Sequence, residues 1–361
     1  MEIIKNKKIL IILVAIILIF IGLTTILICI SKSQKLYPIN NSRGGGYINK
    51  KGKIIIKQKF NFAGKFVGNY AIVECKNKKE GVINKKGNLV LACNYDNLEG
   101  LNENFVLYTM NKKYGFINIP KKTESPALYD DIKPFHQKIA AVKVDEKWGF
   151  ISRNGKYIVS PKYDNVGNFS ENLASVHLNN KTGFINKKGK TIIPYRIDIL
   201  EPKEFNEGLV PVLKEGNNCS YMNSKGEIVI DSKKIYPIVS YCGNFYNGVT
   251  VIYVESNSPN EVTTGYMNKK GKLVHSKTFK LPEGLLKEEF SVFDDFHSNM
   301  AMYTYDWNDG FINNKFKEVI PPVLEFARNF EDDLAYVKYK DREGYINKKG
   351  KWIWVTERTG M

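Results

Sequence analysis

Apolar and polar residues alternate in short segments that recur along the chain after residue 45. In one such segment Ala174, Val176 and Leu178 are apolar, and the residues between them are polar. This alternation predicts a β-strand with one buried and one solvent-facing side. The same alternation recurs at Ala140, Val142 and Val144 and at Ala335, Val337 and Tyr339. No helical period competes with it in the repeats, so the sequence predicts an all-β fold.

A polar octet follows these segments, and residues 183–190 (GFINKKGK) are its clearest copy. Its β-prone residues flank a turn in which Asn186 suits the first position of a type I turn. Gly189 suits the left-handed backbone that closes such a turn. The octet therefore predicts a tight hairpin. Close copies begin at Gly46, Gly81, Gly149, Gly265 and Gly344, and weaker copies begin at Gly115, at Gly310 and around residues 221–226.

Nine copies, spaced by 34 to 45 residues, predict one repeat region over residues 46–355 that is irregular between 220 and 310. A unit of three short strands is too small to enclose a core, so neighbouring units must stack. We expect tandem β-hairpin repeats in an open, elongated array, with a β-propeller-like ring as the alternative. The array is favoured because the copies are unevenly spaced and no lone C-terminal strand is left to complete a first blade. Residues 254–264 predict an exposed loop insertion, and residues 281–290 a short helix.

Residues 9–31 carry no charge and are almost wholly apolar. A helix of about 22 such residues spans about 33 Å, enough to cross the hydrocarbon core of a bilayer. Because lysines precede it, the positive-inside rule favours a cytoplasmic tail at 1–8, a single uncleaved signal anchor in the cell membrane and repeats outside the cell. Basic residues that follow the segment keep the opposite orientation open. Residues 32–45 predict a polar linker, and residues 356–361 a C-terminal tail.

The formal net charge of +17 is strong enough to attract anionic polymers or membrane surfaces. Lysines at the predicted hairpin tips are therefore candidates for binding an anionic partner. Their alternative role is solubility and protection of strand edges. These candidates are Lys187, Lys188, Lys269, Lys270, Lys348 and Lys349.

Two tryptophans complete the set of candidate binding residues. Trp352 and Trp354 alternate on the last predicted strand, so we expect them to share one face. There they would stack on a sugar or cover the exposed end of the last repeat. Lysines interleaved with aromatic residues are also typical of nucleic-acid-binding proteins. Because we expect the repeats to lie outside the cell, we expect no nucleic-acid partner.

No catalytic, cofactor or metal motif is visible. The four cysteines after residue 31 have no C-x-x-C spacing, which argues against a metal site. They are expected to form two disulfides, Cys75 with Cys93 and Cys219 with Cys242, or to remain ordinary half-buried thiols. A Tyr-Asp pair recurs once per repeat, so its aspartate is expected to form a turn rather than to act as an acid or base. We expect no enzyme activity and no cofactor.

Three motifs carry a resemblance to a known family: the segment 147–151 (KWGFI), the octets, and the spacing Phe169-x-x-x-Leu173-Ala174-x-Val176. Together they resemble the WG-repeat family of bacterial proteins over about residues 46 to 355. The family's signature tryptophan is present only at Trp148. The resemblance implies a surface-associated or secreted interaction module with no shared catalytic residues.

These observations predict a membrane-anchored, non-enzymatic β-repeat binding protein of the bacterial cell envelope. Its basic surface would contact an anionic wall polymer, a protein partner or both. A structural spacer or scaffold whose charge has no binding role is one alternative, and a wall-modifying enzyme is another. The sequence indicates no oligomeric state.

Overall fold

The computed structural model describes residues 35–196, 204–214, 218–235, 239–255, 258, 261–280 and 293–356. The predicted anchor helix at 9–31, the tail at 1–8 and the predicted helix at 281–290 lie outside these residues. Within the described ranges, no helix is long and apolar enough to cross a membrane.

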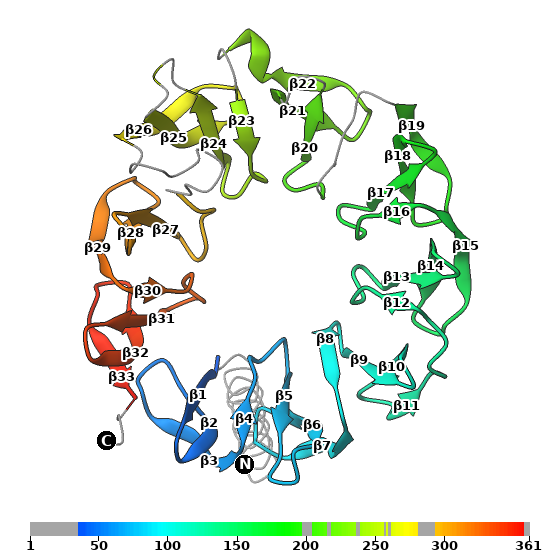
Figure 1. The fold of residues 1–361 in the computed structure, drawn as a ribbon, viewed down its shortest axis with the longest axis vertical. Helices are drawn as coiled ribbons and strands as arrows, with labels where there is room; N and C mark the ends of the chain where they lie inside the picture. Colours follow the sequence, from blue (N-terminus) through cyan, green and yellow to red (C-terminus); the bar gives the residue numbers. More distant parts are fainter. Residues whose placement is uncertain are drawn as a thin grey trace, which may run out of the picture.

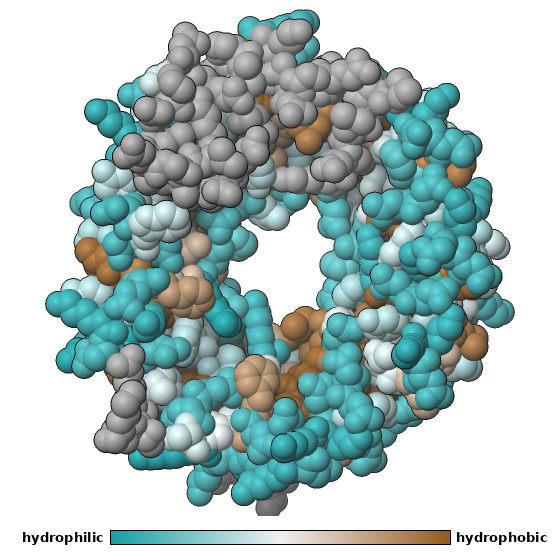
Figure 2. All heavy atoms as spheres, viewed as in Figure 1, coloured by the Kyte–Doolittle hydropathy of each residue, from teal (hydrophilic) through white to brown (hydrophobic). Residues whose placement is uncertain are grey.

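The described residues form nine small β-sheets arranged as a ring, which is a nine-bladed β-propeller (Figure 1). An open channel runs through its centre (Figure 2). Each blade is an antiparallel meander of three or four consecutive strands. In the four-stranded blades made by β12–β15, β16–β19 and β30–β33, the first strand lies nearest the channel and the last strand forms the rim.

The strand bounds follow chain order. Blades 1 to 3 consist of β1 (Tyr37–Asn41), β2 (Gly44–Ile48) and β3 (Ile54–Phe60); β4 (Phe62–Ala63), β5 (Tyr70–Glu74), β6 (Glu80–Asn84) and β7 (Leu89–Tyr95); and β8 (Leu98–Asn102), β9 (Phe105–Met110), β10 (Lys113–Asn118) and β11 (Thr123–Glu124). Blades 4 to 6 consist of β12 (Asp131–Ile132), β13 (Ile139–Val144), β14 (Lys147–Ser152) and β15 (Tyr157–Tyr163); β16 (Asn165–Val166), β17 (Leu173–Leu178), β18 (Lys181–Asn186) and β19 (Thr191–Arg196); and β20 (Leu209–Lys214), β21 (Asn218–Asn223) and β22 (Ile228–Asp231). A short 3₁₀ helix, η1 (Ser232–Lys234), follows. Blades 7 to 9 consist of β23 (Val239–Cys242), β24 (Val249–Glu255), β25 (Glu261–Asn268) and β26 (Leu273–Lys280); β27 (Met300–Tyr305), β28 (Asn308–Asn313) and β29 (Glu318–Leu324); and β30 (Phe326–Ala327), β31 (Leu334–Tyr339), β32 (Arg342–Asn347) and β33 (Trp352–Val355).

The predicted hairpin turn is confirmed. In residues 186–190 the Gly189 amide donates to the Asn186 carbonyl (2.8 Å), and the Asn186 side chain accepts from the amides of Lys188 (2.9 Å) and Lys190 (3.1 Å). Gly189 has φ +77°, the left-handed conformation that glycine adopts without steric cost. The adjoining register shift between β18 and β19 is the bulge that this turn introduces.

The prediction of an open array is wrong, and the alternative, a ring, is correct. Residues 37–41, which fall in the predicted linker 32–45, form β1 and pair with β2, so blade 1 is complete without any strand from the C-terminus. Pro38 is tolerated because β1 is an edge strand, where a missing backbone N–H costs no ladder bond. The longer repeat units between residues 220 and 310 also fit the ring. Part of the predicted loop 254–264 simply extends β24 and β25 into a longer hairpin.

The hydrophobic core lies between blades rather than inside them. The octet aromatic of one blade packs edge-on against an aromatic of the next, as Phe184 does with Phe205 at a centroid distance of 5.2 Å. Equivalent pairs are Tyr47–Phe66, Phe116–Phe135, Phe150–Phe169, Tyr221–Phe245 and Phe311–Phe330. Such edge-to-face pairs are favourable beyond the area they bury. Because each blade needs its neighbour to cover this ring, the contact propagates around the propeller.

Candidate functional site

One face of the propeller carries the nine octet turns. In an antiparallel meander, successive turns lie at opposite ends of the strands, so the turn before the last strand of each blade falls on the same face. We call this the lysine-turn face and define it by residues 49–53, 84–88, 118–122, 152–156, 186–190, 223–227, 268–272, 313–317 and 347–351. These turns contain 21 lysine or arginine residues and one acidic residue, Glu227.

The structure brings all six predicted lysines to the lysine-turn face, in two different environments. Lys188, Lys270 and Lys349 occupy the third turn position and are exposed. Lys269, one position earlier, reaches the preceding blade, where its ammonium lies 3.0 Å from the Glu207 carboxylate. Lys187 and Lys348, at the equivalent position, are half-buried. The exposed third-position lysines are therefore the ones placed to meet a partner.

Acidic residues on this face sit nearer the channel, in two-residue turns that the sequence analysis did not single out. Glu171 and Asn172 form one such turn, with φ values of +49° and +70°, as a type I′ hairpin requires. The Glu171 carboxylate accepts a hydrogen bond from the Gly208 amide of the next blade (2.9 Å). Glu207 makes the same contact with Gly248 (3.0 Å). These carboxylates therefore join neighbouring blades.

A shallow groove of about 570 Å³ opens on the lysine-turn face between blades 3 and 4, lined by Lys121, Lys138 and Arg153 among others. Its one carboxylate, Glu103, lies 2.7 Å from the Arg153 guanidinium and accepts a hydrogen bond from the Lys138 amide (2.9 Å). Burial raises the pKa of Glu103, but the hydrogen bonds from Arg153 and Lys138 outweigh it, so the pKa lies below its usual value. The groove is therefore a basic surface with its acid already paired.

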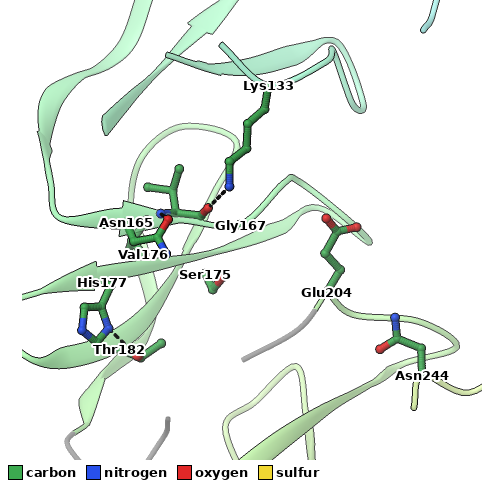
Figure 3. A pocket seen from close by; sticks show the side chains of 10 residues that line it. Lys133, Asn165, Gly167, Ser175, Val176, His177, Thr182, Glu204 and Asn244 are labelled. Carbon is green, nitrogen blue, oxygen red and sulfur yellow. Dashed lines mark hydrogen bonds between the residues drawn. The ribbon is translucent and has the colours of Figure 1, made fainter. Parts of the chain in front are cut away.

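A larger hollow of about 760 Å³ lies on blade 5 and reaches Glu204 and Asn244 of the following blades (Figure 3). In its wall the Lys133 ammonium donates to the Val166 carbonyl (2.5 Å), and His177 Nδ1 lies 2.9 Å from Thr182 Oγ1. The hollow is therefore lined mostly by polar side chains, which come from blades 4 to 7.

The Tyr-Asp aspartates join neighbouring blades, a role that the expected turn did not include. Asp164 lies 2.6 Å from the Lys147 ammonium of the preceding blade and accepts from the Asn179 amide of its own blade (2.9 Å). Asp130 contacts Lys113 and the Asp145 amide in the same way. The hydrogen bond from each lysine is the main cause that lowers the pKa of these carboxyls.

The expectation that Trp352 and Trp354 share a face is wrong. Trp352 pairs with Ile346 and Trp354 with Tyr345, and a register shift lies between the two pairs. This bulge inserts one extra residue and reverses the alternation. Trp352 packs on the core between blades 8 and 9, while Trp354 packs on the core between blades 9 and 1. In a closed ring there is no exposed repeat end for them to cover.

The cysteines form the two disulfides that the sequence analysis considered. Cys75–Cys93 lies within blade 2, and Cys219–Cys242 joins blade 6 to blade 7; each has a Cα–Cα distance of 6.1 Å, inside the usual range. In the described part of the chain, no group of three or more His, Cys, Asp or Glu side chains is placed to hold a metal ion.

These features define a β-propeller protein whose blades derive from one repeated sequence unit. The chain belongs to the WG containing repeat family. The sequence model of this family matches more than half of the chain, at residues 46–79, 81–114, 114–148, 148–181, 183–217 and 310–342. Most matched units begin close to the octet glycine and end just before the next one. Each sequence repeat therefore spans two blades rather than one.

Among solved structures, the chain is similar to BamB from Moraxella catarrhalis (8% identity, TM-score 0.42, covering 88% of this chain and 95% of that one). It is also similar to AztD from Citrobacter koseri (9%, 0.41, 78% and 92%) and to the extracellular domain of BT4673 from B. thetaiotaomicron (11%, 0.41, 90% and 54%). These sequence identities and TM-scores are too low to support any argument about the partners of this chain. A search of curated proteins finds no match.

Proposed function

We propose that this protein is a membrane-anchored, non-enzymatic propeller of the bacterial cell envelope that binds an anionic partner through its lysine-turn face. The observation that supports it most directly is the charge of that face, where the nine turns hold 21 basic residues and one acidic residue. Charges of one sign gathered on one surface attract polyanions far more strongly than the same charges spread evenly.

The opposite face provides a contrast within the same molecule. There the blade-to-blade links place acids beside the lysines, as in the pairs Lys147–Asp164 (2.6 Å) and Lys338–Glu325 (2.7 Å). On that face acidic and basic side chains are mixed, so a polyanion meets less net positive charge there than on the lysine-turn face.

A location outside the cell is supported by the two disulfides, because disulfides persist in oxidising compartments and are rare in the cytosol. The anchor is supported by the uncharged apolar segment 9–31. The non-enzymatic assignment is supported by the acidic side chains of the repeats, since Glu103, Asp130 and Asp164 are each held in ion pairs between blades.

The test is binding of the full-length protein, held in neutral lipid nanodiscs, to a purified anionic wall polymer over a range of salt concentrations. We expect binding at low salt that weakens as salt rises, because exposed charges are screened over about 8 Å at physiological ionic strength. A variant with Lys188, Lys270 and Lys349 changed to Gln should bind more weakly. The matched control changes Lys112, Lys181 and Lys340, which are exposed on the opposite face. Equal loss in both variants, or binding that ignores salt, would refute the proposal.

A further inference from the structure

The chain enters the propeller on the lysine-turn face. Tyr37 at the start of β1 pairs with Ile48, next to the turn at residues 49–53, whereas Asn41 at the far end of β1 pairs with Gly44. Lys35 therefore lies at the end of blade 1 that carries the octet turn. Its ammonium lies 2.8 Å from Asp332, and Lys50 of the octet turn lies 3.2 Å from the adjacent Asp333. These contacts fix the entry point on this face.

The predicted anchor segment ends very close to this entry point. Only residues 32–34 separate Ser31, the end of the uncharged segment, from Lys35. Four Cα–Cα steps of an extended chain reach at most about 14 Å. With the proposed anchor ending at Ser31 at the bilayer surface, the part of the lysine-turn face nearest blade 1 would be held within about two Debye lengths of that surface.

Most acids of this face are already in ion pairs, which leaves its exposed third-position lysines available to an anionic surface. Of the six acidic residues in the inner turns, five are in ion pairs with basic residues of the propeller: Glu103, Glu207, Glu331, Asp332 and Asp333. The exposed third-position lysines Lys188, Lys270 and Lys349 lie on three different blades. A flat anionic surface would contact all three of them at once without having to bend around the ring.

We propose that the lysine-turn face rests on the anionic phospholipid headgroups of the bilayer that holds the anchor. This inference rests on the proposed function and names the anionic partner as the membrane itself. The short tether brings the face to the headgroups, and the lysines keep the ring flat on them. The opposite face and the rim then point away from the membrane, and β33 ends on that outward side.

The experiment compares full-length protein in nanodiscs of phosphatidylcholine with protein in nanodiscs of equal phosphatidylcholine and phosphatidylglycerol. Lysines are acetylated with an amine-reactive reagent, and the rate at each lysine is measured by mass spectrometry. Anionic headgroups should slow the reaction of Lys188, Lys270 and Lys349 by about fivefold, the factor that corresponds to an attraction of about 1 kcal/mol between one lysine and an anionic membrane surface. Lys112, Lys181 and Lys340 should react equally in both nanodiscs. High salt should restore the rates.

Two further outcomes separate this inference from the proposed function. If the lysine-turn residues react equally in both nanodiscs but are protected when a soluble anionic wall polymer is added to the neutral ones, the membrane inference fails and the proposed function stands. If neither the lipid nor the polymer protects them, both fail. Protection of Lys112, Lys181 and Lys340 by the anionic lipid would place the wrong face on the membrane and would overturn the inference.

Discussion

The hydroxyl of Tyr345 on β32 donates a hydrogen bond to the Pro38 carbonyl on β1 (2.8 Å), and its ring lies 5.6 Å from that of Tyr37 at an angle of 61°. This contact joins the last blade to the first. It repeats the edge-to-face contact found between consecutive blades, such as Phe184 with Phe205. The propeller therefore closes by ordinary blade packing and not by exchange of a strand.

Loss of the Tyr345 ring should destabilise the propeller strongly. Tyr345 is 7% exposed and belongs to the core between blades 9 and 1. We expect Tyr345→Ala to lower the free energy of unfolding by about 3 to 5 kcal/mol. Tyr345→Phe keeps the ring and should cost about 1 kcal/mol for the lost hydrogen bond. Urea denaturation of the two variants checks both values. A small loss in Tyr345→Ala would mean that closure does not depend on this contact.

The strands and turns of each repeat could be predicted from the sequence. The closing of the repeats into a ring through β1 could not. The turn at Asn186–Gly189 follows from local backbone preferences, so the octet predicted it correctly. The polar character of residues 32–45, with a proline and glycines, predicts a linker and hides the strand at residues 37–41. Yet Tyr37 lies nine residues before Gly46, as Ala174 lies nine before Gly183. That spacing is the signal that could have identified the first strand.

The candidate site was predicted only in part, because the residue types alone do not show in which direction each side chain points. The sequence placed lysines at hairpin tips, but it could not show that Lys269 turns toward Glu207 of another blade while Lys270 faces solvent. The bulge beside Trp352 follows the octet turn at residues 347–351 just as the bulge between β18 and β19 follows the turn at residues 186–190. The octet therefore carries the signal for this bulge, and strict alternation along the last strand was the wrong expectation.

Removal of the Cys219–Cys242 disulfide should loosen the joint between blades 6 and 7. The bond links β21 to β23 across a sequence separation of 23 residues. Closing a loop of this size stabilises the folded state by about 3 kcal/mol in the chain-entropy account. The double change Cys219→Ser and Cys242→Ser should lower the free energy of unfolding by about this amount.

Thermal and urea unfolding with and without reductant check the disulfide prediction. Reductant should lower the stability of the native protein and leave a variant without any of the four bonded cysteines unchanged. Non-reducing peptide mapping of the native protein should recover Cys219 linked to Cys242 and Cys75 linked to Cys93. Recovery of free thiols at these positions would contradict the structure.

A side chain at Gly115 should displace the ring of Tyr108. The two residues face each other across β9 and β10. A Cβ atom at Gly115 would lie 2.5 Å from the Tyr108 ring. The ring is held in place because the Tyr108 hydroxyl donates a hydrogen bond to the Ser125 carbonyl (2.6 Å). We expect Gly115→Ala to cost about 1 to 3 kcal/mol through overpacking.

A double-mutant cycle tests this assignment of the strain. In a Tyr108→Ala background the same Gly115→Ala change should cost much less, because the ring that it meets is gone. Gly68→Ala is the control: no atom lies within 4 Å of the added Cβ there, and only the left-handed backbone at φ +61° opposes it. Additive effects of Gly115→Ala and Tyr108→Ala would show that the ring is not the cause.

Protonation of His275 should destabilise the fold as the pH falls. His275 on β26 stacks on Phe316 at a centroid distance of 5.0 Å and an angle of 4°. Burial, and then the nearby Lys277, lower its pKa below the usual value. The unfolded chain therefore binds the proton more readily than the folded one. The stabilisation is complete above about pH 6.5, the ordinary histidine value, and is lost as the pH falls below it.

Urea midpoints measured from about pH 7.5 to about pH 5.5, a range that brackets the ordinary histidine pKa, check this expectation. The native midpoint should fall with decreasing pH, and His275→Phe, which keeps an aromatic ring against Phe316, should fall less steeply. Equal slopes in the native protein and in His275→Phe would show that His275 titrates alike in the folded and unfolded states, and that its contact with Phe316 does not sense pH.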